Sequence, residues 1–125
     1  MKKKGSTSDF ISQRNAELRK AFFSQNHYST SDTVMKQTIS TPSSRFWVDP
    51  ARARDIISRI EKDPDILQRM YPERKRMYAA LYRKYREIQS RFPARSKIQN
   101  VTMAIYSGAP EFFISPSRAR SILYS

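Results

Sequence analysis

Four arginines at matched positions are the residues in this chain best suited to bind an anion. Arg52 and Arg54 occupy one copy of a repeated motif, and Arg118 and Arg120 occupy the other. Each pair falls in the first turn or so of an expected helix, where amide groups and the helix dipole favour anions. Arginine adds a planar, bidentate geometry that suits phosphate oxygens. We therefore predict nucleic-acid contacts from Arg52 and Arg118, whereas Arg54 and Arg120 are either structural or functional.

A second group of candidates lies in the segment 72–97, which carries 9 basic and 2 acidic residues, a net charge of +7. A helix face of this kind can contact several phosphates and gives steeply salt-dependent binding. Tyr82 lies among these charges, in the mixture found where bases stack or phosphates are hydrogen-bonded. The alternative is a solvated face that only keeps the protein soluble. The predicted nucleic-acid-binding residues of this segment are Arg74, Lys75, Arg76, Tyr82, Arg83, Lys84, Arg86 and Arg91.

The arginine pairs belong to a motif that occurs twice, at an offset of 66 residues. Residues 45–57 and 111–123 align without a gap, and six positions are identical. Each copy has an aromatic-aliphatic run, a capping residue, a proline and then a helical pattern. The residues before each copy also correspond, so we expect pseudo-repeats at about 33–60 and 99–125.

The elements that position these residues are expected to be mostly helices. Two short runs, 45–48 and 111–114, have strand character and are expected to pair as an antiparallel ribbon, because a lone strand leaves its backbone groups unsatisfied. The predicted fold class is mainly α with a small two-stranded antiparallel β-ribbon, made of internally duplicated helix-turn-strand-helix units around a long central helix. Residues 1–9 are expected to form a basic flexible tail and residues 10–125 a single domain. Helices are expected at about 10–24, from the 29–32 run to residue 40, at 50–62, 72–91 and 96–108, and from 116 onward, with a short helical piece near 66–70.

Composition limits the classes of function. The chain has 125 residues with 24 Lys and Arg against 11 Asp and Glu, giving a net charge of +13. This imbalance favours a polyanionic partner, DNA more than RNA, although an acidic protein partner fits it as well. With no cysteine, one histidine and two glycines, we find no pattern for a zinc site, a catalytic triad or a phosphate loop, and we expect no enzyme activity, metal or cofactor. No long apolar run is present, so we expect a cytoplasmic protein without a membrane partner; the oligomeric state stays open.

Three short segments resemble small uncharacterised basic proteins of gut-bacterial phages and conjugative elements. The segments are RNAEL at 14–18, SRFWV at 44–48 and GAPEFF at 108–113. The resemblance implies a mobile-element setting, and no activity, cofactor or residue role comes with it.

The sequence therefore leads to one main hypothesis and one competitor. The main hypothesis is a non-enzymatic protein that binds double-stranded DNA, as a small regulator or accessory factor of a phage or mobile element. The competitor is a protein-interaction or structural module, which binds a host factor or packs inside a virion without contacting nucleic acid.

Overall fold

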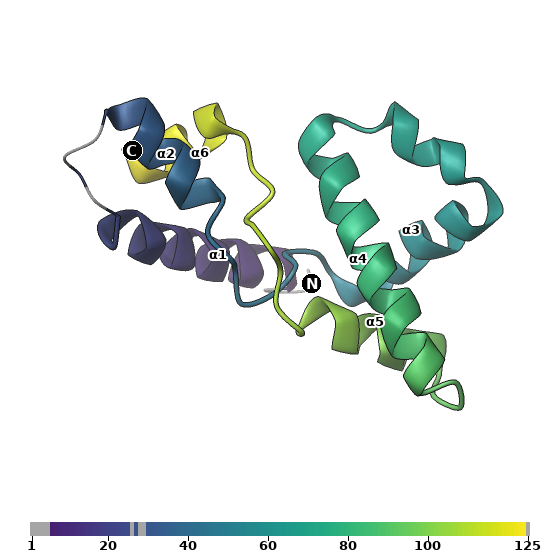
Figure 1. Ribbon diagram of the computed structural model, residues 1–125. Helices are drawn as coiled ribbons and strands as arrows, with labels where there is room; N and C mark the ends of the chain where they lie inside the picture. Colours follow the sequence, from purple (N-terminus) through teal and green to yellow (C-terminus); the bar gives the residue numbers. More distant parts are fainter. Residues whose placement is uncertain (1–5, 26, 28–29, 125) are drawn as a thin grey trace, which may run out of the picture. The chain divides into compact units, whose positions relative to one another are not determined.

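The computed structural model of the chain describes residues 6–25, 27 and 30–124, and over these residues the chain is mainly helical, as predicted (Figure 1). Residues 1–5 of the expected tail lie outside the described part, and the first helix begins at Ser6. None of the described helices is long and apolar enough to cross a membrane. The elements are α1 (Ser6–Phe23), α2 (Ser31–Ile39), α3 (Pro50–Lys62), the 3-10 helix η1 (Pro64–Arg69), α4 (Pro72–Arg91), α5 (Lys97–Ile105) and α6 (Pro116–Leu123).

Side-chain caps define where several helices begin. Asp49 accepts hydrogen bonds from the backbone N–H groups of Ala51 and Arg52, at 3.1 and 3.2 Å, and thereby caps α3. Ser96 and Gln99 form a reciprocal capping box at the start of α5. The capping residue that the sequence predicts before the proline of the first copy is therefore Asp49, and this prediction is confirmed.

The chain divides into two compact units. Unit 1 consists of residues 1–43 and 110–125 and contains α1, α2 and α6, while unit 2 consists of residues 44–109 and contains α3, η1, α4 and α5. Within unit 1, α2 packs against α6 and both contact α1; within unit 2, α3 packs against α5, and α4 contacts both (Figure 1). Each unit therefore combines one helix from the 33–60 segment with one from the 99–125 segment.

The core of unit 1 is small. Leu18 of α1 and Met35 of α2 are fully buried, and Ala119 of α6 is equally inaccessible. Three buried residues of the segment before α6 complete this core: Phe112, Phe113 and Ile114.

The core of unit 2 is built on the inner face of α4. Its buried side chains are Tyr78, Leu81, Tyr85 and Ile88, which is the 3-4-3-4 spacing of an amphipathic helix. They pack with buried side chains of α3 and α5, the helices that α4 contacts. The predicted helix 72–91 is thus present, but it serves as the spine of unit 2 and not as a central helix for two repeats.

Two buried tyrosines make unit 2 sensitive to alkaline pH. Burial raises the pKa of both Tyr78 and Tyr85 above the ordinary value of 10.0. The unfolded chain then loses these phenolic protons at lower pH than the folded chain. The contribution of the two neutral phenols to the free energy of unfolding is therefore intact below pH 10 and is lost as the pH rises further. We expect the free energy of unfolding, measured by urea denaturation, to fall above pH 10, and to fall less steeply in Tyr78→Phe. A stability that is unchanged between pH 9 and pH 11 would contradict this prediction.

The predicted β-ribbon is wrong, since the described residues form no strand. The backbone N–H of Phe46 donates instead to the carbonyl of Ile105, at 2.9 Å, and the N–H of Phe112 donates to the carbonyl of Ile39, at 3.0 Å. Ile39 and Ile105 are the last residues of α2 and α5, whose terminal carbonyls have no partner within their own helices. In each expected strand, one backbone N–H is therefore satisfied by the carbonyl at a helix end.

Two further features explain why the strands do not form. Phe113 has φ of 58°, which lies in the left-handed region and interrupts an extended run. In the other segment the guanidinium of Arg45 donates to the carbonyls of Phe46 and Val48, at 2.9 and 2.8 Å. A side chain thus takes the place that a partner strand would have filled.

Candidate anion-binding surface of unit 2

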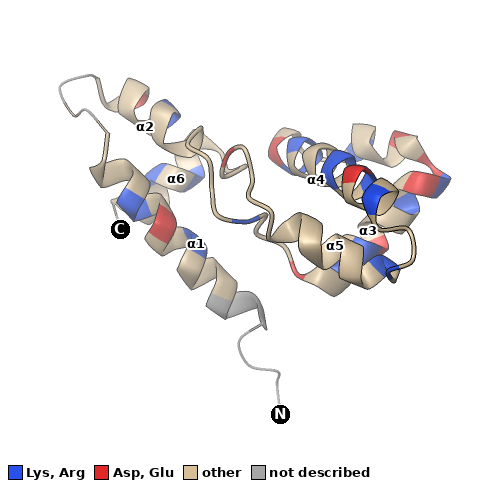
Figure 2. Cartoon of the chain, turned by 60° about the horizontal axis from the view of Figure 1, so that its bottom comes forward, with Lys and Arg blue, Asp and Glu red and all other residues tan. Residues whose placement is uncertain are grey.

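The outward side of α4 divides into two faces of different charge. At about 100° per residue, four basic residues lie on one side of the helix, away from the buried Tyr78–Ile88 stripe, and Glu87 borders this set one turn after Arg83. We call this set the outer strip; Figure 2 shows the basic segments along α4 in blue. The outer strip consists of Lys75, Arg76, Arg83 and Arg86.

The other face of α4 is balanced in charge. Lys84 and Arg91 lie on it together with Glu73 and Glu87, and the Nζ atom of Lys84 pairs with Oε1 of Glu87 at 3.2 Å. This face therefore attracts an anion less than the outer strip does. Of the predicted binding residues of this helix, Lys84 and Arg91 lie on this balanced face, and Arg74 lies off the outer strip as well, beside the buried Tyr78.

Two cations of the outer strip form hydrogen bonds with neutral groups. The Nζ atom of Lys75 donates to Oε1 of Gln68 at 3.1 Å. The guanidinium of Arg86 donates to the hydroxyl of Tyr82 at 3.1 Å, a hydrogen bond that raises the pKa of Arg86. Arg83 has no ion-pair partner within the described part of the chain. Lys75, Arg83 and Arg86 therefore keep their charge available to a ligand.

Tyr82 lies at the edge of the outer strip. Its ring is half-buried, stacks on Tyr85 with centroids 6.4 Å apart, and has the guanidinium of Arg86 over it at 5.8 Å. The ring is therefore partly used by protein contacts, and its hydroxyl orients Arg86.

Arg52 and Arg74 come together on unit 2, although they are 22 positions apart in the sequence. The guanidinium of Arg74 lies 5.3 Å from the ring centroid of Tyr78. The positive charges of Arg74 and Arg52 partly offset the effect of burial, which raises the pKa of Tyr78. The two exposed arginines thus converge on one buried phenol, and no carboxylate pairs with either of them in the part of the chain described.

The first-turn amides next to the repeated arginines are already hydrogen-bonded. The carboxylate of Asp49 accepts a hydrogen bond from the backbone amide of Arg52. The hydroxyl oxygen of Ser115 accepts one from the backbone amide of Arg118, at 3.1 Å. An anion would therefore meet the side chains of Arg52 and Arg118 and not free backbone donors. Arg118 belongs to unit 1, where its charge adds to burial in lowering the pKa of Arg14.

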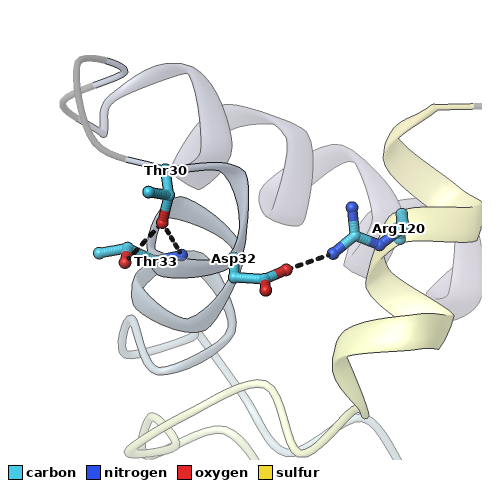
Figure 3. Close-up of polar contacts among 4 residues, drawn as sticks. All are labelled: Thr30, Asp32, Thr33 and Arg120. Carbon is cyan, nitrogen blue, oxygen red and sulfur yellow. Dashed lines mark hydrogen bonds and ion pairs between the residues drawn. The ribbon is translucent and has the colours of Figure 1, made fainter.

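Arg54 and Arg120, whose roles the sequence left open, differ in their surroundings. Arg120 pairs with Asp32 of α2, with 3.0 Å between nitrogen and oxygen, and so links α6 to α2 in unit 1 (Figure 3). The same end of α2 is capped by Thr30, whose hydroxyl oxygen accepts from the amide of Thr33. Arg54 is exposed and has no polar partner among the described residues.

Three basic residues that the sequence did not single out gather near Arg74. Arg59 and Lys62 of α3 and Arg69 of η1 line a cavity of about 470 Å³ together with Arg74. Arg59 and Lys62 are exposed on α3, and the fold of η1 brings Arg69 to them. Among the described residues, no group of His, Cys, Asp and Glu is arranged to hold a metal ion.

Comparisons with known proteins give no guide to these surfaces. No protein-family model, no curated protein and no solved structure matches the chain. The function is therefore inferred from the surfaces themselves.

Proposed function

We propose that the protein binds nucleic acid without catalysing a reaction, and that duplex DNA is the preferred form. The observation that carries this proposal is the outer strip of α4, which gathers four cations on one side of the helix and is bordered by a carboxylate of α4, that of Glu87. Unit 2 as a whole has 15 Lys and Arg against 7 Asp and Glu, a net charge of +8.

The spacing of the strip suits a phosphate backbone. Arg76 and Arg86 are ten residues apart, or about 15 Å along the helix axis. Duplex DNA carries one charge for about every 1.7 Å of its axis, so a helix of this length spans several phosphates. Arginine and lysine contacts to phosphate position a protein on DNA and carry no sequence information. We therefore propose binding of low sequence specificity, as expected of a small regulator or accessory factor.

Arg52 and Arg74 extend this surface toward the start of α4. Both are exposed, and the charges of both act on the same buried residue, Tyr78. Two neighbouring guanidinium groups repel each other, and a shared phosphate relieves that repulsion through charge-assisted hydrogen bonds. Arg118, on unit 1, is proposed as a separate phosphate contact. The mobile-element setting is proposed on the sequence resemblance alone.

A salt titration tests the proposed function. We expect the full chain to bind a labelled random-sequence duplex in fluorescence anisotropy, and log K to fall linearly with log salt concentration. A slope of about −3.6 corresponds to the four residues of the outer strip, at about 0.9 for each phosphate neutralised, and contacts from Arg52, Arg74 and Arg118 add up to about −2.7 more. Absence of binding to duplex and single-stranded DNA at low salt would refute the proposal. Tighter binding to RNA than to DNA would support the proposed binding surface but would identify RNA, and not DNA, as its ligand.

A further inference from the structure

Unit 2 contains a cavity whose lining differs in character from the outer strip. It opens where α3 ends, η1 runs and α4 begins, and its volume is about 470 Å³. Three aliphatic or thioether side chains, Ile56, Ile66 and Met70, form an apolar floor. The other lining residues are charged: Arg59, Lys62, Asp63, Arg69 and Arg74.

The rim of the cavity is strongly cationic, with four basic residues and one carboxylate. Arg69 pairs with Asp63 at 3.2 Å and Arg59 pairs with Asp55 at 3.3 Å, with more than half of each side chain exposed. Exposed ion pairs of this kind contribute little and exchange partners readily. Lys62 and Arg74 pair with no carboxylate among the described residues. A ligand that carries several negative charges therefore meets two cations without a carboxylate partner, Lys62 and Arg74, and two more whose exposed ion pairs it can displace, Arg59 and Arg69.

We propose that this cavity binds an acidic peptide segment of a partner protein. One large aliphatic side chain of the peptide packs on the floor of Ile56, Ile66 and Met70, and the flanking carboxylates face the cations of the rim. The volume lies within the range of specific binding pockets and holds more than one side chain. A single buried anchor surrounded by polar contacts is the usual way in which such interfaces gain affinity.

The lining favours a peptide over a nucleic acid. None of the eight lining residues is aromatic, so a base would find no ring on which to stack. None of the lining residues has an amide or hydroxyl side chain, and these are the neutral groups that proteins use to recognise base edges. A phosphate backbone would use the rim and leave the apolar floor empty. Only a ligand with both an apolar group and carboxylates uses the whole cavity.

The test uses the full chain and a matched pair of peptides. The first is a fluorescently labelled peptide in which one leucine is flanked on both sides by glutamate and aspartate, and the second has alanine in place of the leucine. We expect the alanine peptide to bind about tenfold more weakly in anisotropy, since it loses the buried side chain. The double variant Arg59→Gln, Lys62→Gln is expected to weaken binding of the leucine peptide about fivefold. The matched control Arg54→Gln, Arg91→Gln removes the same charge elsewhere on unit 2, off the outer strip, and is expected to leave peptide binding unchanged.

Three outcomes would overturn the proposal. The leucine peptide fails to bind, or it binds no more tightly than the alanine peptide, in which case only net charge is recognised. Alternatively, Arg59→Gln, Lys62→Gln weakens duplex binding and leaves peptide binding unchanged, which would assign the cavity to the nucleic-acid surface. Because the peptide and DNA titrations are separate readouts on the same variants, either proposal can fail while the other holds.

Discussion

Replacing Arg76, Arg83 and Arg86 by glutamine is expected to weaken duplex DNA binding on the order of a hundredfold in about 0.1 M salt. The three side chains are exposed and belong to the outer strip of α4. Each cation that no longer neutralises a phosphate also lowers the slope of log K against log salt concentration by about 0.9, so the slope should become shallower by nearly three. Fluorescence anisotropy over a range of salt concentrations measures both quantities.

The control for this prediction is a triple variant with the same charge. Arg54→Gln, Lys84→Gln and Arg91→Gln also remove three positive charges from unit 2, but from positions off the outer strip. We expect its salt slope to stay close to that of the original protein. Equal weakening in the two triple variants would show that DNA responds to the net charge of the unit and not to the strip. Circular dichroism spectra of the variants check that the helices are intact.

Local sequence signals predict most of the helices because the forces that define them are local. Asp49 and Pro50 mark the start of α3 through a side-chain cap and a fixed φ angle, both of which act within one turn. The spacing of Tyr78, Leu81 and Tyr85 likewise marks the buried face of α4. The same periodicity also separates the basic residues of α4 into the outer strip and the balanced face.

The pairing of segments across the chain could not be predicted in this way. A short extended segment does need partners for its backbone groups, but in this protein helix C-termini supply them. The carbonyls of Ile39 and Ile105 accept from Phe112 and Phe46, and these hydrogen bonds join residues more than 50 positions apart. Periodicity carries no information about which carbonyl an isolated amide will reach. For the same reason, the sequence pattern does not show that the repeated segments are divided between two units.

The candidate sites follow the same rule. The outer strip depends on one helix, so its members could be named from the sequence. The meeting of Arg52 with Arg74 at Tyr78 depends on how α4 packs against α3, and the cavity depends on the path of η1 between them. Arg69 in particular carried no signal, because a short 3-10 helix has too few residues for a periodic pattern.

Arg45 shows how a basic residue can be structural in a protein with this net charge. It is 7% exposed, and its guanidinium donates to the carbonyl of Phe46, to the carbonyl of Val48 and to the hydroxyl of Tyr106, the last at 3.0 Å. It also lies over the rings of Trp47 and Tyr106, at 5.2 and 4.6 Å from their centroids. We expect Arg45→Met, which keeps much of the side-chain volume, to lower the free energy of unfolding by about 3 kcal/mol.

The physical reason for this cost is that methionine leaves two backbone carbonyls without their donor in a segment that has no partner strand. Thermal denaturation followed by circular dichroism should show a melting temperature lower by about 10 °C or more. Arg54→Met removes an exposed arginine from the same unit and is expected to change stability by less than about 0.5 kcal/mol. Tyr106→Phe removes the hydrogen bond between Arg45 and the hydroxyl of Tyr106. Its loss of unfolding free energy should lie between those of Arg54→Met and Arg45→Met, at about 1 kcal/mol. If Arg45→Met melts like Arg54→Met, the 45–48 segment is held by its apolar side chains alone, and the guanidinium does not replace the missing strand.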